Sequence, residues 1–401
     1  MAQSNIAYAK KNRFYIKLRS FRFSLYKLAL RVAPRRPLPG YTKIFLVPSS
    51  AKLSEATKNK ILSLKEAVKI PIYTNDAGFS KHFQLDYLLE EKIGNDTLIL
   101  VIDFSFTSLI RYFPYLQSIR IVDENFWSFH EANGWVRIFN DITSATVRNE
   151  IKKKSRENLK KLIERTASKE KSVCFVTGPS FDDYNKFHYD NCVKVICNSI
   201  VKNEAFLTYI KGPDVLAFAD PVFHMGLNPY GEEFRNSVSK VIADYSDCII
   251  VTTHSCAVMM THLMPEVSNN LIGFDSSRDS YMIDLEKMSI YPTDNVLTLL
   301  MLPVAALVSK EIAIIGADGR EKSEKYFWKH NKSVQFNGAM DKAFEFHPSF
   351  FRDRIYTDYY DQHCDQLEQH LQDYEKHRKT IVTLTNSHIP ALQKRTKGVT
   401  L

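Results

Sequence analysis

Polar side chains and glycines follow five apolar runs in the second half of the chain, at the point where each run ends. They are Thr177-Gly178-Pro179-Ser180, Asn198-Ser199, Asp220-Pro221, Thr253-His254-Ser255 and Gly316-Ala317-Asp318-Gly319. In open parallel sheets, ligands bind at the carboxyl ends of the strands. Five successive ends of this kind therefore predict a cleft lined with polar groups.

Two of these residues carry side chains suited to catalysis. Asp220 could act as a nucleophile, and His254 could act as an acid or base or bind an anionic group. Both residues also have ordinary structural interpretations, because an aspartate before a proline commonly caps a turn and a histidine at a strand end is commonly hydrogen-bonded. His224 is a third candidate, since it would share a helix face with Asp220 if a helix begins there.

The remaining polar residues suit the binding of a nucleotide. Gly178 and Ser180 fit a turn whose amides and hydroxyl receive an anion at a helix start. Asn198 can donate and accept hydrogen bonds toward a base or a ribose, and Asp318 can accept from either. Ordinary tight turns explain these residues equally well, so both interpretations stay open at this point.

Several motifs that mark common enzyme classes are absent from the sequence. G-x-G-x-x-G, G-x-x-x-x-G-K-[ST], G-x-S-x-G and H-E-x-x-H do not occur, which weighs against dinucleotide, P-loop, hydrolase and zinc-protease chemistry. D-x-D is also missing, which weighs against a glycosyltransferase that holds a nucleoside diphosphate through a metal. A donor with a single phosphate needs no such metal, so we expect neither a metal nor a cofactor. His363, His370 and His377 recur every seven residues, about 10 Å apart on a helix, and we interpret them as a surface stripe.

The composition is that of a folded protein of two domains. The chain has 401 residues, of which 44% are hydrophobic and 12% aromatic, and this excludes disorder. No apolar stretch is long enough to span a bilayer. The six cysteines show no metal or disulfide spacing, so we expect buried thiols in a cytoplasmic protein.

Short β-branched and aromatic runs alternate with helical stretches, which predicts an α/β fold with parallel sheets. In the first half we expect strands at 43–48, 70–73, 97–103 and 119–122, and helices near 54–67 and 83–92. A charged helix near 147–167 leads to strands at 173–177, 193–197, 215–219, 248–252, 271–274, 312–315 and 380–384, with helices near 297–308 and 361–379. We therefore expect a leader at 1–40 and two Rossmann-like domains at 41–168 and 169–401.

The leader carries the excess positive charge of the protein. Residues 1–54 contain twelve Lys or Arg and no acidic residue, whereas the rest of the chain has 42 basic and 45 acidic residues. Within residues 10–36, basic residues alternate with an apolar series that recurs at threes and fours: Phe14, Leu18, Phe21, Leu25, Leu28 and Val32. This pattern predicts a basic amphipathic helix that either binds an anionic membrane surface or packs on its own protein. The slightly acidic body argues against a nucleic-acid partner.

Several segments resemble the bacterial sialyltransferases that use CMP-sugars. VCFVTGPS at 173–180, VICNS at 195–199, LAFADP at 216–221 and IAIIGADG at 312–319 follow that family's order of motifs, and VTLTNS at 382–387 is similar to its closing strand. The segment 346–349, FHPS, is similar to a His-Pro motif that related families place at the CMP phosphate. The resemblance spans about residues 172–392 and implies a GT-B-like fold. It also implies that the second domain binds the CMP-sugar through Gly178, Pro179, Ser180, Asn198, Ser199, Asp318, His347, Ser349, Asn386 and Ser387.

One departure from that family points to a narrower resemblance. The sialyltransferases have Asn before the proline where this chain has Asp220, and this difference, with the extra N-terminal domain, resembles the retaining β-Kdo transferases. Those enzymes move Kdo, an eight-carbon 2-keto acid, from CMP-β-Kdo onto glycans of lipopolysaccharide O-antigen or capsule, through an aspartyl adduct. The resemblance implies a metal-independent glycosyltransferase with Asp220 as nucleophile, because Asn cannot form the adduct. His254 is the second catalytic candidate.

The sequence also suggests where the protein acts and leaves two alternative functions open. The basic leader fits a cytoplasmic enzyme, peripheral at the inner membrane, that acts on a lipid-linked glycan. Glu124, Asn125 and Trp127 are candidates for acceptor binding, and the charged end up to Lys397 fits one module of a longer polypeptide. The alternatives are an inverting sialyltransferase, in which Asp220 only binds or acts as a base, and a non-catalytic glycan-binding protein at a membrane surface.

Overall fold

The structure is a computed structural model of the chain, in which two compact units are described. The described residues are 17, 21, 24–26, 28, 40–47, 53–89, 92–102, 110–122, 128–320, 331–336 and 356–396. The first unit contains the described residues up to 149 together with Asp220–Gly231, and the second contains those of 150–219 and 232–396. The division between the units falls inside helix α6, Ala145–Thr166, whereas the sequence placed it after this helix, at 168.

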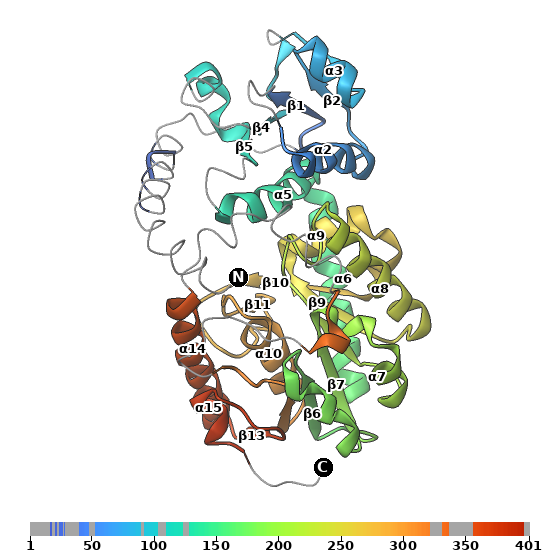
Figure 1. Ribbon diagram of the computed structural model, residues 1–401, viewed down its shortest axis with the longest axis vertical. Helices are drawn as coiled ribbons and strands as arrows, with labels where there is room; N and C mark the ends of the chain where they lie inside the picture. Colours follow the sequence, from blue (N-terminus) through green and yellow to red (C-terminus); the bar gives the residue numbers. More distant parts are fainter. Residues whose placement is uncertain are drawn as a thin grey trace. The chain divides into compact units, whose positions relative to one another are not determined.

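The first unit is built on a five-stranded parallel sheet with the order β3-β2-β1-β4-β5 (Figure 1). This is the arrangement of one Rossmann-type half, which confirms the expected α/β fold with a parallel sheet. The strands are β1 Lys43–Val47, β2 Ile72–Thr74, β3 Asp86–Tyr87, β4 Thr97–Val101 and β5 Ile119–Ile121. The helices are α2 Glu55–Ala67, α3 Ala77–Phe83, η2 Phe113–Ser118 and α5 Ser128–Ile142.

The sequence predicts a helix at 83–92, and this prediction is wrong. Helix α3 ends at Phe83, because Gln84 adopts the left-handed conformation (φ 52°) and its N–H closes the last turn on the carbonyl of Ser80. The helix starts earlier than expected, where Asp76 caps it by accepting a hydrogen bond from the N–H of Phe79 at 2.8 Å. The chain then enters the short strand β3, which pairs with β2.

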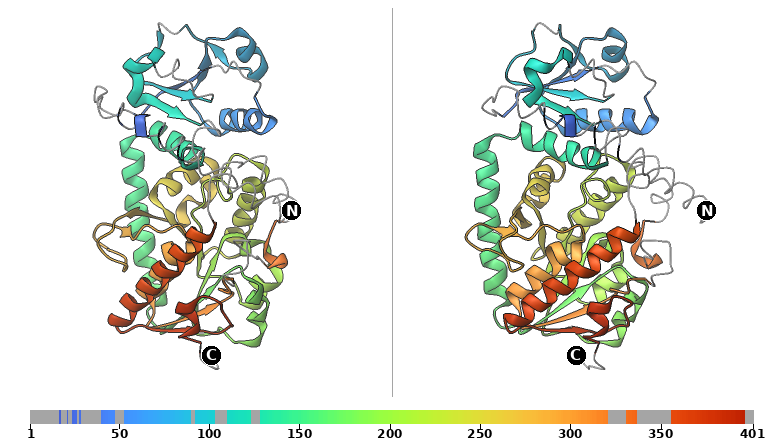
Figure 2. Two further views of the ribbon diagram at one scale, coloured as in Figure 1. Left: turned by 60° about the vertical axis from the view of Figure 1, so that its left-hand side comes forward. Right: turned by 90° about the vertical axis from the view of Figure 1, so that its left-hand side faces the viewer.

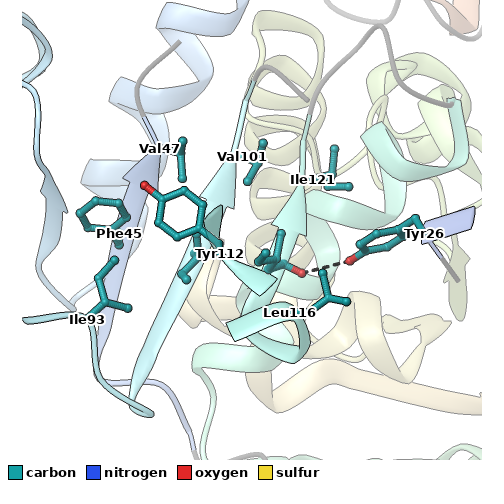
Figure 3. Packing of buried hydrophobic residues seen from close by; sticks show 10 residues of the cluster. Tyr26, Phe45, Val47, Ile93, Val101, Tyr112, Leu116 and Ile121 are labelled. Carbon is teal, nitrogen blue, oxygen red and sulfur yellow. Dashed lines mark hydrogen bonds between the residues drawn. The ribbon is translucent and has the colours of Figure 1, made fainter. Parts of the chain in front are cut away.

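The core of the first unit lies between its central strands and the residues that cover them. Figure 3 shows Phe45 and Val47 of β1, Val101 of β4 and Ile121 of β5 packed in one cluster. Tyr26 of the leader joins this cluster, with 5% of its surface exposed, and its hydroxyl donates to the carbonyl of Ile119 at 3.4 Å. The leader is therefore connected to the sheet through a buried side chain.

The second unit is built on an eight-stranded parallel sheet with the order β11-β10-β9-β8-β7-β6-β12-β13. Its strands are β6 Lys171–Phe175, β7 Cys192–Cys197, β8 Val215–Ala217, β9 Ile249–Thr253, β10 Leu271–Ser276, β11 Ser289–Ile290, β12 Glu311–Ile315 and β13 Thr380–Thr383. All the strands expected from the sequence are present, and the two-residue strands β3 and β11 were not expected because they are too short to show a pattern.

Helices cover both faces of this sheet, as expected for right-handed crossovers between parallel strands. Figures 1 and 2 show α7 and α8 on one side and α10 and α14 on the other. The helices and helical turns are η3 Pro179–Lys186, η4 Asn198–Lys202, α7 Glu204–Tyr209, α8 Pro229–Asp244, α9 His254–Leu263, η5 Pro265–Asn270, η6 Leu297–Met301, α10 Leu302–Val308, η7 Lys332–Val334, α14 Tyr356–Lys376 and α15 Pro390–Gln393.

The cysteines and the helices can be compared with what the composition predicts. All six cysteines are free thiols, and five of them are buried, as expected, whereas Cys364 is half-buried. Within the described parts of the chain, no helix combines the length and the apolar character needed to cross a bilayer.

A buried ion pair in the first unit generates a test of its stability. The Nε atom of Arg120 donates to Asp141 at 2.5 Å, and its Nη1 atom donates to the carbonyls of Gln117 and Ile119. Burial alone would lower the pKa of Arg120, but the charge of Asp141 and its hydrogen bond, together with Tyr26 and Tyr41, raise it.

We expect Asp141→Ala to lower the free energy of unfolding by about 3–5 kcal/mol, because it leaves a buried guanidinium without its carboxylate. Urea unfolding would measure the loss. The control is Glu55→Ala, which breaks an exposed ion pair with Lys58 and should cost far less. Equal losses for the two variants would contradict the interpretation.

Candidate functional site

The eight-stranded sheet has a topological switch point between β6 and β12. From β6 the chain moves strand by strand to β11, and it then returns to place β12 and β13 on the other side of β6. The segments that follow β6 and β12 therefore leave in opposite directions, and such a point is where open α/β sheets bind ligands. The structure places Gly178, Pro179 and Ser180 after β6 and Asp318 after β12, at this point.

Hydrogen bonds join the ends of three neighbouring strands at the switch point. The N–H of Gly178 donates to the carbonyl of Gly316 at 2.8 Å, and the N–H of Gly316 donates to the hydroxyl of Thr385, which follows β13, at 3.2 Å. A Cβ atom on Gly178 would lie 2.2 Å from a carboxylate oxygen of Asp318, so glycine is required there for close approach. Gly316 has a φ of 78°, which also favours glycine.

The carboxylate of Asp318 occupies the start of η3. The N–H of Ser180 donates to both carboxylate oxygens of Asp318, at 3.1 Å each. Burial raises the pKa of Asp318, and the hydrogen bonds from Ser180 partly oppose this rise. The Ser180 amide already has an acidic partner, so a phosphate at this turn would meet a carboxylate rather than a free amide. The carboxylate of Asp318 therefore takes the place that a bound anion would have at this turn.

Asn198 lies at the end of the adjacent strand β7 and begins η4. Its backbone is left-handed, with a φ of 49°, and its Oδ1 atom is buried with no hydrogen-bond partner among the residues that the structure describes. A buried amide oxygen without a donor is costly, so this atom is suited to a ligand that donates. The neighbouring Ser199 is also buried.

Of the other predicted nucleotide-binding residues, the structure describes Asn386 and Ser387 and not His347 or Ser349. Ser387 is buried, donates to the carbonyl of Ala317 at 2.6 Å and accepts from the N–H of Ile389, so its hydroxyl holds the turn after β13. Asn386 is exposed. His347, Ser349, Glu124, Asn125 and Trp127 lie outside the described residues, and their expected roles stay predictions.

A cavity of about 40 Å³ lies at the switch point. It is lined by Val176, Thr177, Gly178, Asn295, Leu297, Gly316, Ala317, Asp318, Gly319, His363 and Ile389. This volume holds about three water molecules, so it accommodates one end of a nucleotide and not the whole molecule. Sequence reasoning missed Asn295 and His363, because neither follows one of the expected strands.

The prediction that His363 and His370 form a surface stripe is wrong. Both side chains are buried, with 4% and 0% of their surface exposed, and only His377 of the three is exposed. Burial lowers the pKa of His363 to about 4, and burial together with His363 lowers that of His370 to about 4. Aromatic rings surround His370: the ring centroid of Tyr281 lies 4.4 Å away, and the hydroxyl of Tyr374 lies 3.2 Å from its Nδ1 atom. Both imidazoles are neutral at pH 7.

Asp220 begins a hydrogen-bonded turn in the first unit. Its Oδ1 atom accepts from the N–H groups of Val222 and Phe223 at 2.8 Å each, and its own N–H donates to the Nδ1 atom of His224 at 3.2 Å. No helix begins here, but His224 does contact Asp220 through the backbone. The structural role considered for Asp220 is thus observed. Within the described parts of the chain, its Oδ2 atom has no hydrogen-bond partner.

His254 is the first residue of α9, directly after β9. Its neighbour Thr253 caps this helix by accepting from the N–H of Cys256 at 3.4 Å. The His254 side chain is buried, and Gly273 on β10 allows close packing, because a Cβ atom there would lie 3.0 Å from the Cα of His254. His254 therefore occupies a strand end, as expected, inside a tightly packed environment.

The described residues contain no group of three or more His, Cys, Asp or Glu side chains arranged to hold a metal ion. The features that the structure brings together at the switch point are a half-buried carboxylate, a neutral imidazole, a side-chain amide from Asn295 and three glycines. Such a set can bind hydroxyl and amino groups through hydrogen bonds.

Comparisons with known proteins give no family for this chain. No protein-family model matches it, and no curated protein matches it. One solved structure that it matches is from Clostridium difficile 630, of a protein proposed to be a phosphosugar isomerase. The sequence identity is 14%, the match covers 76% of this chain and 92% of that chain, and the TM-score is 0.16. A similarity at this level supports no inference about fold or function.

The buried His363 makes the stability of the second unit dependent on pH. The unfolded imidazole takes up a proton as the pH falls below about 6.5, whereas the folded one stays neutral down to about 4. We therefore expect wild-type stability to fall across this window, and His363→Asn to remove about 3 kcal/mol of that fall. Urea unfolding between pH 7 and pH 4 measures it.

The matched control is Gln362→Asn, at an exposed position of the same helix α14. It should leave the pH dependence of unfolding unchanged, because neither glutamine nor asparagine carries a titratable group. The interpretation fails if His363→Asn and wild type lose stability in parallel as the pH falls.

Proposed function

We propose that the protein is a GT-B-type glycosyltransferase that moves Kdo from CMP-β-Kdo to a glycan acceptor with retention. One observation carries this proposal. The five segments that resemble the CMP-sugar enzymes are spread over residues 173–387, yet their strands are neighbours in one sheet, in the order β8-β7-β6-β12-β13. All five strands are parallel, so the motif residues follow them at the same edge of the sheet.

The polar groups at this edge support a cytidine rather than a phosphate at the switch point. Cytosine carries an exocyclic amino group that donates hydrogen bonds, and the Oδ1 atom of Asn198, which has no partner among the described residues, is an acceptor. Ribose hydroxyls can donate to the Asp318 carboxylate in the cavity, where a phosphate would be repelled. We therefore propose that the phosphate binds away from this turn, and we keep His347 and Ser349 as candidates for it.

The Asp220 turn supports the proposed nucleophile. Its two backbone hydrogen bonds hold the Oδ1 atom, which fixes the orientation of the carboxylate and leaves Oδ2 to react. In the first step Oδ2 forms a bond to the anomeric carbon C2 of Kdo, and the bond from C2 to the phosphate oxygen breaks. CMP leaves with the electron pair of that bond, and a glycosyl ester on Asp220 remains.

In the second step an acceptor hydroxyl attacks the same carbon from the face that CMP left. Its proton passes to a base, the bond to Asp220 breaks, and the carboxylate is regenerated. Two inversions give overall retention. We keep His254 as the candidate for the base, because an imidazole commonly acts as a general base. No metal takes part in either step of this proposal, and the acceptor is a glycan, lipid-linked at the cytoplasmic face of the inner membrane.

The nucleotide assignment predicts a selective thermal shift. CMP at a hundred times its dissociation constant should raise the unfolding temperature by roughly 5–10 °C, with or without EDTA. UMP should give a much smaller shift, because its base has a carbonyl in place of the amino group that Asn198 would bind. Asn198→Ala should reduce the preference for CMP over UMP.

The control for Asn198→Ala is Asn203→Ala, which removes the cap of α7 in the same unit and should keep the CMP preference. A shift with a nucleoside diphosphate only, or with no nucleotide, would overturn the CMP assignment.

The nucleophile assignment predicts a loss of activity without a loss of fold. Asp220→Asn keeps an oxygen for the two backbone N–H groups, so its unfolding temperature should stay close to wild type. Transfer from CMP-β-Kdo should fall at least about a thousandfold, because an amide cannot form the ester. Mass spectrometry of wild type with donor alone should find Kdo on the peptide that contains Asp220.

Asp76→Asn is the matched control, because Asp76 caps a helix in the same unit through the same kind of hydrogen bond. It should keep full activity. An active Asp220→Asn variant with an inverted product would favour the sialyltransferase-like alternative. If CMP does not bind and glycan binding survives in Asp220→Asn, the non-catalytic alternative holds.

A further inference from the structure

The leader helix exposes a set of apolar side chains on one face. Its described residues 17, 21, 24–26 and 28 are helical. Phe21 is 59% exposed, Leu25 37% and Leu28 57%, and these three recur at the spacing that brings residues to one side of a helix. Exposed Lys17 and Ser24 share this side. We define Phe21, Leu25 and Leu28 as the leader face.

The opposite side of the helix is fixed to the protein. Tyr26 lies about 100–160° around the helix axis from the residues of the leader face. It is 5% exposed and belongs to the same buried cluster as Leu116 (Figure 3). Its hydroxyl donates to the backbone carbonyl of Ile119. The sequence left open whether the apolar series packs on the protein or faces outward, and the exposure of Phe21 and Leu28 favours the second.

We propose that the leader face inserts into the surface of an anionic lipid bilayer. Three large apolar side chains on one exposed side are suited to the boundary between lipid headgroups and acyl chains. Residues 1–54 supply twelve positive charges and no negative one, which complements anionic headgroups at about 1 kcal/mol per basic residue near the surface. A protein partner would need acidic groups to match this charge, whereas an anionic bilayer presents them at every position.

This proposal does not depend on the glycosyltransferase activity. The first unit carries its own membrane contact, and Tyr26 holds that contact on the protein. The contact is reversible, because the helix lies on the bilayer and does not cross it. Binding should therefore need both the apolar face and the negative surface charge.

The test is flotation of the full chain with vesicles of phosphatidylcholine containing about one-third phosphatidylglycerol. Wild type should float with these vesicles at low salt, and it should stay in solution with pure phosphatidylcholine or at high salt. Phe21→Glu/Leu28→Glu should lower the partition coefficient at least about tenfold with an unchanged unfolding temperature, because both side chains are exposed in the protein.

The matched control is Leu62→Glu/Tyr87→Glu, which adds the same charge at side chains that are 41% and 54% exposed elsewhere in the first unit. It should float like wild type. Equal loss in the two double variants would mean that net charge alone acts, and it would overturn a role for the leader face. If wild type ignores anionic vesicles but forms a dimer that Phe21→Glu/Leu28→Glu dissociates, the face binds a second copy and the proposal is wrong.

Discussion

The turn after β12 is the constraint on which the switch point of the second unit depends. Two adjacent parallel strands, β6 and β12, end side by side, and their chains must then separate. The backbone groups left at these ends need partners, and one short segment supplies them: Gly316 accepts from Gly178, and Asp318 accepts from Ser180. A Cβ atom on Gly316 would lie 2.1 Å from the carbonyl of Val176, so the close approach and the left-handed turn both require glycine at this position.

The same constraint decides which chemistry the cavity can support. Because the carboxylate of Asp318 fills the start of η3, the switch point is an acceptor-rich site and not an anion cradle. The neutral His363 of the cavity and, at the end of the neighbouring strand β7, the buried Oδ1 atom of Asn198 add further polar atoms without adding positive charge. A nucleoside fits this character better than a phosphate, which is why the proposed donor is oriented with its cytidine toward the sheet.

The sequence predicted the strands and their polar ends well because both follow from local patterns. Apolar runs identified every strand longer than two residues, and glycine-rich ends located Gly178 and Asp318 correctly. The environment of a polar residue could not be predicted in this way. His370 lies on the buried face of α14 because aromatic residues far away in sequence, such as Tyr281, surround it. Likewise, Asp318 accepts a hydrogen bond from Ser180, which is 138 positions away in the sequence, and no spacing rule identifies this partner.

The position of Tyr26 also bears on how the chain can be shortened. Strand β5 is the last strand of its sheet, and the carbonyl of Ile119 at its beginning is bound by the Tyr26 hydroxyl. A truncation that removes the basic leader would take away one of two donors to this carbonyl, because Arg120 also donates to it, and would uncover the apolar surface of Leu116. Apolar surface exposed beside an edge strand favours pairing with other molecules. The leader is thus a part of the folded unit that protects this edge from aggregation.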